Sequence, residues 1–359
     1  MSCKTELLSF LRGKPKEITA VVMPDFFLDR LIDLDCTPKN FCSQVKAVAR
    51  RKGGSIDGVN QNDIRGGNAV NTASALAALG VDAIPIVCTD QLGLQQLRFH
   101  LDRYHVDTSH VKVLAKASIT TALELKTDTG KANVMLRDLG SLANFGPENL
   151  TENDYRLIEE ADYICVFNWA GTKNHGTELA RTIFKRTKTR GKGKTYYDTA
   201  DPTPNKEDIP ELMEKVLKTA QIDVLSLNEN EAITYARHLA SDAISEKRKT
   251  GFSEQALESA RVLAKRLSAR IDLHTTGFSA TFTGKSEVAV PAFKIKPLRA
   301  TGAGDAWNAG NILGDGNGLS DECRLTLANA VSASYLSYPE AMHPTKQMLS
   351  KFLESIDFE

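Results

Sequence analysis

The sequence lacks a net charge, and this absence restricts the partners that the protein can have. Its 359 residues include 45 Lys and Arg and 45 Asp and Glu residues, so the formal net charge is zero. Proteins that bind nucleic acid or an anionic membrane through their overall field carry an excess of basic residues. No nucleic-acid motif, internal repeat or low-complexity segment compensates for the missing charge. We therefore expect neither nucleic acid nor a membrane as a partner.

A long apolar run and a secretory leader are missing as well. Residues 1–17 carry charges on both sides of a short apolar patch. No later run approaches the roughly 18 apolar residues that a membrane-spanning helix requires. On this pattern we expect a cytoplasmic protein.

Cysteine is scarce, and its six occurrences form no pattern. No two cysteines make a C-x-x-C pair, none has the histidine spacing of a zinc site, and Cys88 and Cys165 lie within apolar runs. We interpret the cysteines as reduced residues that mostly serve packing.

What the sequence does contain is an alternation of strand-like and helix-like segments. Amphipathic helical segments separate predicted buried strands at 18–23, 81–88, 162–168, 195–198, 222–227 and 271–276. Such alternation is typical of an α/β fold with a central, mostly parallel sheet and helices on both faces. The length suits one large body, so we treat residues 1–359 as a single domain.

The periodicity changes between residues 108 and 137. Short strands are predicted at 110–117, 120–126 and 132–137, and the last two are joined by T-D-T-G-K, in which Gly130 can take a positive φ. Antiparallel strands inserted into a βαβ series predict a small separate β-sheet. We expect segments at approximately 30–65 and 108–137 to form this sheet as a lid over the ligand.

The segment 300–314 reads A-T-G-A-G-D-A-W-N-A-G-N-I-L-G. Its glycines let the chain bend, and the Ala-rich run from Ala306 predicts a buried helix. The N–H groups and the dipole at the start of a helix suit a phosphoryl group, and Asp305 would hold a carboxylate beside it. On the residues alone, Asp305 is either a base that accepts a proton from a hydroxyl or simply the N-cap of the helix.

Polar side chains also follow the first strand and begin the next helix. Asp25 and Asp29 come after the strand end, where ligands bind in open α/β sheets. Asn68 and Asn71 lie three residues apart in the first turn of a helix, so their amides suit one polyhydroxyl ligand. The alternatives are a surface ion pair for Asp29 and helix capping for Asn68.

The segment N-E-N-E at 228–231 begins another predicted helix. Asn228 and Glu231 match a capping box, in which each side chain bonds the backbone N–H of the other residue. The same two residues suit a second role, in which they help to hold Mg²⁺ through water on a nucleotide phosphate. The residues alone leave both interpretations open.

Three motifs occur in a fixed order along the chain. They read R-G-G-N-A-V-N-T-A at 65–73, S-L-N-E-N-E-A at 226–232 and T-G-A-G-D-A-W-N-A-G at 301–310. With these motifs on a βαβ chain, the sequence resembles the ribokinase/PfkB family of carbohydrate kinases from about residue 18 to its C-terminus. The resemblance implies transfer of the γ-phosphoryl group of ATP to a hydroxymethyl group of a sugar or related small alcohol, with ATP and Mg²⁺ as cofactors.

The resemblance also implies a role for each matching position. Asp305 corresponds to the catalytic base. The family's anion hole corresponds to the N–H groups of Gly302, Ala303 and Gly304. The sugar-contacting positions are Asp29, Gly67, Asn68 and Asn71. The nucleotide-binding positions are Asn228, Thr275, Gly277 and Asn329, and Glu231 would hold the metal through water.

One stretch departs from the family's pattern. The family has Asp-Thr-Thr ahead of G-A-G-D, in a region that helps to bind a monovalent cation, whereas this chain has Arg299, Ala300 and Thr301. We expect the Arg299 guanidinium to supply part of that charge, so that K⁺ gives no activation over Na⁺.

Two alternatives to a sugar kinase remain. An enzyme of this fold could phosphorylate a nucleoside or a pyridoxal-like alcohol, although 108–137 contains no Phe, Trp or Tyr on which a base could stack. The chain could instead be a catalytically silent sugar-binding regulatory protein. Besides a small-molecule sugar, the expected partners include a second copy of the chain, because an exposed edge of the lid sheet could pair two copies in a homodimer.

Overall fold

The computed structural model describes residues 2–128, 130–240, 251–298, 301–338 and 342–356, and its centre is an eight-stranded sheet. The strand order is β14-β13-β12-β11-β10-β9-β1-β4. The bounds are β1 Thr19–Met23, β4 Asp82–Pro85, β9 Tyr163–Phe167, β10 Lys194–Asp198, β11 Val224–Leu227, β12 Arg270–His274, β13 Phe278–Phe282 and β14 Glu287–Pro291. From β4 to β12 all neighbours are parallel, and β13 and β14 are antiparallel. The prediction of an α/β fold with a mostly parallel central sheet is confirmed.

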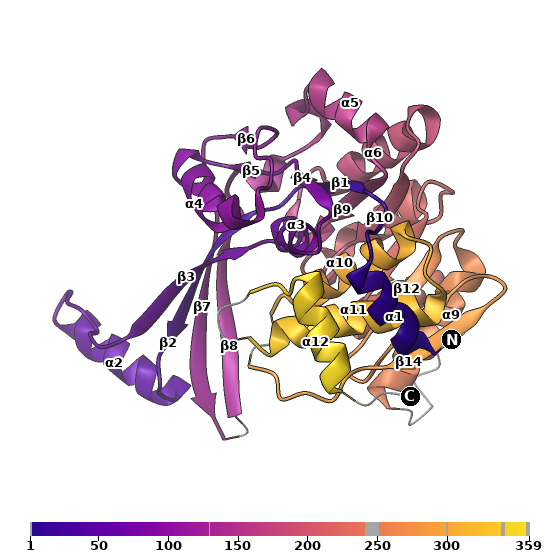
Figure 1. Cartoon of the computed structure of the whole chain (residues 1–359). Coiled ribbons are helices and arrows are strands. Elements are labelled where there is room, and N and C mark those ends of the chain that lie inside the picture. Colours follow the sequence, from indigo (N-terminus) through magenta and orange to yellow (C-terminus); the bar gives the residue numbers. More distant parts are fainter. Residues whose placement is uncertain (1, 129, 241–250, 299–300, 339–341, 357–359) are drawn as a thin grey trace.

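Helices cover both faces of this sheet (Figure 1). One face carries α3 (Asn68–Ala78), α10 (Ala303–Gly316) and α11 (Asp321–Leu336), with α1 (Cys3–Arg12) and α12 (Lys346–Ser355) packed on the outside. The other face carries α6 (Gly176–Arg190), α8 (Glu229–Leu239) and α9 (Phe252–Arg266), with α5 (Glu152–Glu160) and α7 (Ile209–Leu212) beside them.

Successive residues of a central strand pack into different cores. Val21 and Met23 of β1 belong to the core beneath α6, α8 and α9, whereas Ala20 and Val22 belong to the core beneath α3, α10 and α11. Side chains alternate across a strand, so a sheet covered on both faces requires continuous apolar runs. This requirement explains why residues 18–23 of the sequence contain no polar side chain except that of Thr19.

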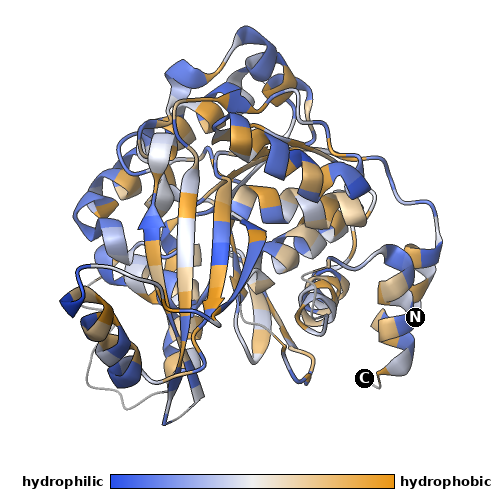
Figure 2. Cartoon of the chain, turned by 90° about the vertical axis from the view of Figure 1, so that its left-hand side faces the viewer, coloured by the Kyte–Doolittle hydropathy of each residue, from blue (hydrophilic) through white to orange (hydrophobic). Residues whose placement is uncertain are grey.

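A second, smaller sheet projects from the main body at the left of Figure 1 and faces the viewer in Figure 2. Its order is β3-β2-β7-β8, with only β2 and β7 parallel. The bounds are β2 Phe27–Asp33, β3 Asn60–Gly66, β7 Ser118–Thr127 and β8 Gly130–Asp138. Helix α2 (Pro38–Arg50) connects β2 and β3. Helix α4 (Gln91–Leu101) follows β4 of the central sheet and precedes β7 of the smaller sheet in the sequence. The predicted separate β-sheet is therefore present.

The predicted strand at 110–117 is wrong for most of its length. Only β6 (Lys112–Val113) forms, and it pairs with the equally short β5 (Cys88–Thr89). Two of the three polar residues of this segment turn inward, while Lys116 is exposed and pairs with Asp138 at 2.5 Å. The two inward residues, His110 and Lys112, contact the buried carboxylate of Asp154, at 2.7 and 2.6 Å.

In the described part of the chain, no helix combines the length and the apolar character needed to cross a membrane. All six cysteines have free thiols, and Cys88, Cys165 and Cys323 are buried.

A buried charge cluster lies between the sheet and the inner surface of α10. The carboxylate of Asp272 in β12 accepts hydrogen bonds from Arg324 of α11 at 3.0 Å and from Asn311 of α10 at 2.8 Å. Arg270 contributes a further ion pair at 2.9 Å. Burial alone would raise the pKa of Asp272, but the two guanidinium groups outweigh it and hold that pKa well below its ordinary value.

Removing one partner from this cluster should strongly destabilise the fold. We expect R324M to lower the free energy of unfolding by about 3–5 kcal/mol, because a buried carboxylate loses a charged partner. R181M is a matched control, since the Arg181–Glu178 pair is exposed and should contribute less than about 1 kcal/mol. Urea unfolding measures both changes, and equal losses in the two variants would contradict a stabilising role of the cluster.

Candidate active site

Helix α10 begins at Gly302, a position that only glycine fits. Its φ is 82°, and a Cβ there would lie 2.6 Å from the hydroxyl oxygen of Tyr335. The first helical hydrogen bond joins the Ala306 N–H to the Gly302 carbonyl oxygen at 3.1 Å. The N–H groups of Ala303, Gly304 and Asp305 therefore have no helical acceptor and lie at the positive end of the helix dipole.

The carboxylate of Asp305 is held between the first turns of α3 and α10. The Asn68 amide donates to one carboxylate oxygen at 2.8 Å, and the Asn71 amide donates to the other at 3.0 Å. The interpretation of Asp305 as an N-cap is wrong, because Gly302 occupies that position and Asp305 is the third residue of the helix. The structure thus brings together three predicted site residues, and both asparagine amides contact the carboxylate.

A second carboxylate, that of Asp25, fixes the beginning of α3. It accepts hydrogen bonds from the N–H groups of Asn68 and Ala69, at 2.8 and 2.9 Å, and from the Asn168 amide at 2.7 Å. Capping of α3 by Asn68 is therefore wrong. Gly67 precedes the helix with φ at 95°, and a Cβ there would lie 2.8 Å from the Asp25 carbonyl oxygen. Because Asp25 accepts from the first N–H groups of α3, the Asn68 side chain is free to donate to Asp305.

The environment of Asp305 makes it an unusually basic carboxylate. Burial raises its pKa to about 8, and the charges of Asp198 and Asp25 add to this effect. The hydrogen bonds from Asn71 and Asn68 lower the pKa but do not cancel the burial. Asp305 is thus poised to exchange a proton near neutral pH.

Asp29 lies in β2, on the smaller sheet. Its Oδ1 atom is buried and has no hydrogen-bond partner in the part of the chain that the structure describes. Burial raises the pKa of Asp29 to about 6 despite the Thr120 hydroxyl and the Arg137 charge. The alternative of a surface ion pair is wrong, because Arg30 pairs with Asp63 at 2.7 Å. An unpartnered carboxylate oxygen is a place where a ligand hydroxyl can donate.

Asn228 and Glu231 form the capping box at the start of α8. The Asn228 N–H and amide donate to the two oxygens of Glu231 at 2.9 and 2.7 Å, and the Glu231 N–H donates to Asn228 at 3.0 Å. Burial, followed by the Asp198 charge, raises the pKa of Glu231 well above its ordinary value. The hydrogen bonds from Asn228 fix the orientation of the Glu231 carboxylate and leave each oxygen able to accept one further contact.

Thr275, Gly277 and Asn329 lie farther along the same cavity. The Thr275 hydroxyl shapes the turn by donating to the Phe278 carbonyl oxygen at 2.8 Å, and the space beside Gly277 is open. The amide oxygen of Asn329 accepts from Ser279 at 2.6 Å and from the Trp307 indole at 3.0 Å. The Asn329 side chain thus supports the wall of the cavity from within.

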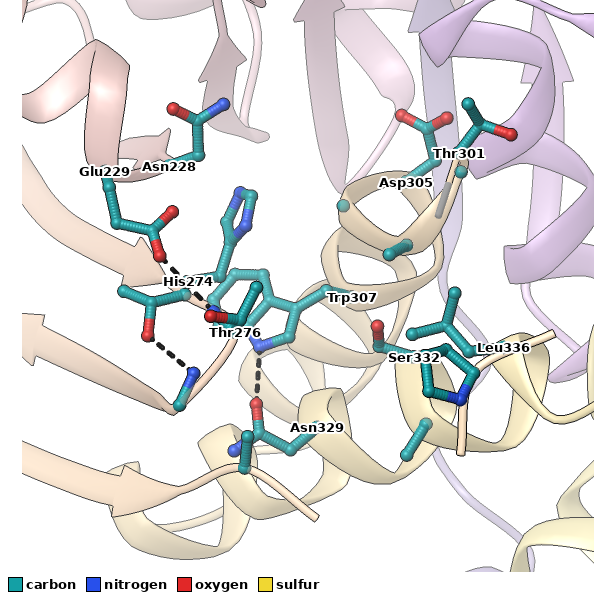
Figure 3. Close-up of a pocket in the computed structure, with 18 of the residues that line it drawn as sticks. Asn228, Glu229, His274, Thr276, Thr301, Asp305, Trp307, Asn329, Ser332 and Leu336 are labelled. Atoms are coloured by element: carbon teal, nitrogen blue, oxygen red, sulfur yellow. Dashed lines mark hydrogen bonds between the residues drawn. The ribbon is translucent and has the colours of Figure 1, made fainter. Parts of the chain in front are cut away.

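A cavity of about 1020 Å³ collects most of these residues (Figure 3). The predicted residues that line it are Asn68, Asn228, Glu231, Thr275, Gly277, Gly302, Ala303, Gly304, Asp305 and Asn329. Of the predicted sugar positions, Asp29, Gly67 and Asn71 do not line it. Arg299 and Ala300 lie outside the described residues, so the expectation about K⁺ stays a prediction.

Several lining residues lie outside the predicted set, among them Asp198, His274 and Trp307. Asp198 and His274 are the last residues of β10 and β12. Their position at the carboxyl ends of strands is a signal that the sequence carries, since ligands of open α/β sheets bind there.

A family model confirms what the motifs indicate. The description "pfkB family carbohydrate kinase" matches residues 31–348. The chain belongs to this family. Membership makes the protein a kinase of the carbohydrate-kinase type. No curated protein matches this kinase in sequence.

Solved structures show that the kinase has the ribokinase fold. Ribokinase from Arabidopsis thaliana with ribose and ATP has a TM-score of 0.70 at 16% identity, covering 94% of this chain and 99% of that one. Ribokinase from Cryptococcus neoformans with ADP gives the same values. A nucleoside kinase from Methanocaldococcus jannaschii has a TM-score of 0.67 at 15% identity, covering 96% and 100%. At such identities the likeness establishes the fold alone.

The raised pKa of Asp305 should appear in the stability of the kinase. Between the ordinary value of 3.8 and the raised value of about 8, the folded protein binds a proton that the unfolded chain has lost. Stability contributed by this group therefore falls as pH rises through that window. D305N removes the titrating group. The difference in free energy of unfolding between D305N and the wild type should therefore shift in favour of D305N by up to about 1.4 kcal/mol for each unit by which the pH rises.

Urea unfolding of both proteins at several pH values between about 5 and 8 measures this difference. D57N is the control, because Asp57 is exposed and its replacement should leave the pH dependence unchanged. Parallel stability curves for D305N and the wild type would contradict the raised pKa.

Proposed function

We propose that this kinase transfers the γ-phosphoryl group of ATP to a hydroxymethyl group of a sugar or related small alcohol, with Asp305 as the general base. The observation that carries the proposal is the position of the Asp305 carboxylate. It lies beside the unpaired N–H groups at the head of α10 and in contact with Asn68 and Asn71. A base and an anion hole are thus neighbours, as phosphoryl transfer requires.

The chemistry follows from these groups. Asp305 accepts the proton of the acceptor hydroxyl as that oxygen bonds to the γ-phosphorus, the bond from phosphorus to the bridging oxygen breaks and ADP leaves. The raised pKa of Asp305 makes it a better proton acceptor than an ordinary aspartate. The N–H groups of Gly302, Ala303 and Gly304 donate to the oxygens of the transferred group, where charge is concentrated. Asn68 and Asn71 orient the carboxylate before the acceptor arrives.

The polar groups on the acceptor side favour a sugar. Asp29 offers an oxygen that has no partner among the described residues, and we assign it to a sugar hydroxyl together with Gly67, Asn68 and Asn71. The described residues of β7 and β8 include no aromatic side chain for stacking a base. A nucleoside or pyridoxal-like acceptor remains the alternative.

The cavity is compatible with a nucleotide. ATP would supply the phosphoryl group, with Asn228, Thr275, Gly277 and Asn329 along its binding site. Among the described residues, no three His, Cys, Asp or Glu side chains form a metal cluster. Mg²⁺ on nucleotide phosphates needs none, because it keeps several waters and takes one or two carboxylates. Glu231, backed by Asn228, would hold it through water.

We further propose that the smaller sheet is a lid on the single domain of residues 1–359. Met135 of β8 lines the cavity, so one face of the sheet already borders the site. The proposed lid is formed by the predicted segments at approximately 30–65 and 108–137. The cytoplasmic location stays a prediction.

The other face of the lid supports a homodimer. Since Met135 faces the cavity, its neighbours Val134 and Leu136 face away, and they are 46% and 58% exposed. Ile119 of β7 is on the same outer face and is 40% exposed. If two copies cover these faces, L136E should convert a dimer into a monomer in analytical ultracentrifugation. A wild-type monomer at every concentration would contradict the proposal.

A screen for ADP release tests the function itself. Purified protein with Mg²⁺ and ATP would be offered pentoses, hexoses, sugar phosphates, nucleosides and pyridoxal-like alcohols. We expect ADP release with one sugar class. If none of the acceptors leads to ADP release, the result favours the catalytically silent sugar-binding protein.

D305N tests the assigned base. The variant keeps the shape of the side chain but cannot accept the proton, so kcat should fall roughly 10²- to 10⁴-fold. Binding of the sugar, measured by calorimetry, should change little. An unchanged kcat would show that Asp305 is not the base.

A further inference from the structure

The histidine at the end of β12, His274, lies against the backbone of the proposed anion hole. A Cβ built on Gly304 would lie 3.3 Å from its Cε1 atom and 3.9 Å from its Nε2 atom. Its ring also packs on the Trp307 indole, with centroids 5.0 Å apart and planes at 34°. In Figure 3 the imidazole stands between Asn228 and Glu229 on one side and the helix that carries Asp305 on the other.

The Nε2 atom of His274 is buried and has no hydrogen-bond partner among the described residues. The side chain as a whole is partly exposed and lines the cavity. Native proteins satisfy nearly all buried polar atoms, so an unpartnered nitrogen in a binding cavity indicates a missing ligand atom. A neutral imidazole has one donor and one acceptor nitrogen, so it can donate to an oxygen that enters the cavity.

The groups around His274 show its electrostatic environment and its position relative to Asp305. Asp198, Glu229 and Asp272 are the charged groups that act on the ring, and burial nevertheless lowers its pKa. His274 is also on the nucleotide side of Asp305, because the next residue is Thr275 and the Thr276 N–H contacts Glu229 at 3.3 Å. The acceptor side of Asp305 is occupied by Asn68 and Asn71.

We propose that His274 contacts the nucleotide directly and donates a hydrogen bond from its imidazole to a phosphate oxygen. This inference rests on the proposed function, because it requires a nucleotide in the cavity. It adds one side-chain donor to the backbone N–H groups at the head of α10. The contact goes to the phosphates rather than to the nucleoside, since the ring lies against Gly304 within the anion hole.

Calorimetry with the full chain separates this contact from a packing role. H274F keeps a ring against Trp307 and removes the donor, so its Kd for MgATP should rise about 10- to 100-fold. Its Kd for adenosine should stay unchanged, because adenosine has no phosphate. H274Q supplies an amide donor and should restore part of the lost affinity.

H238F is the matched control, because His238 is exposed on α8 and should not affect either ligand. Unchanged MgATP binding by H274F, or an equal loss for MgATP and adenosine, would overturn the inference. If the wild type bound no MgATP, the proposed function and this inference would fail together. If H274F lost MgATP affinity but the wild type phosphorylated no acceptor, the histidine contact would stand and the proposed reaction would fail.

Discussion

The site depends on the meeting of two helix beginnings around one carboxylate. The first turns of α3 and α10 converge on Asp305, and each contributes what the other lacks. Helix α10 supplies the carboxylate and unpaired N–H groups, whereas α3 supplies two amides that fix the carboxylate's orientation. Burial disfavours the charge on Asp305 more strongly than the amides favour it. A loosely held or exposed aspartate at this point would lack both the orientation and the basicity.

The parallel sheet explains why residues far apart in the sequence meet here. In parallel strands, the carboxyl ends lie at one edge, and loops from that edge surround a common crevice. Asp198 and His274 end β10 and β12, Asn228 follows β11, and Asp25 follows β1. The sheet thus brings carboxylates, an amide and an imidazole to one edge, where the first turns of α3 and α10 meet.

Much of the fold and several site positions could be predicted because their signals are local. Apolar runs identified the central strands, and the glycines of the third motif indicated a helix beginning that is open to a ligand. Gly302 is such a case, since its left-handed φ and its contact with Tyr335 exclude any side chain. The capping box of Asn228 and Glu231 was also readable, because both partners lie within one turn.

Contacts between residues that lie far apart in the sequence could not be predicted. Asn68 matches a cap by its position, yet Asp25, 43 residues earlier, caps the helix instead and frees the Asn68 amide for Asp305, 237 residues later. The segment at 110–117 has the alternation of a strand, but two of its polar residues, His110 and Lys112, contact Asp154. His274 directly precedes the predicted position Thr275 but is not itself one of the predicted positions, and its packing against Gly304 becomes visible only in the folded chain. Local patterns specify elements, whereas these contacts arise from tertiary packing.

The distribution of charge around the cavity limits how a phosphate ligand can bind. Burial, with the charge of Asp198 adding to it, raises the pKa values of both Glu231 and Asp305. Lys294 is the one cationic side chain among the described residues that line the cavity. A nucleotide would add several negative charges to this crowded acidic region. Helix N–H groups and a neutral imidazole can donate hydrogen bonds, but they cannot neutralise that charge. A cation that arrives with the nucleotide can, which gives the proposed use of Mg²⁺ an electrostatic reason in this particular cavity.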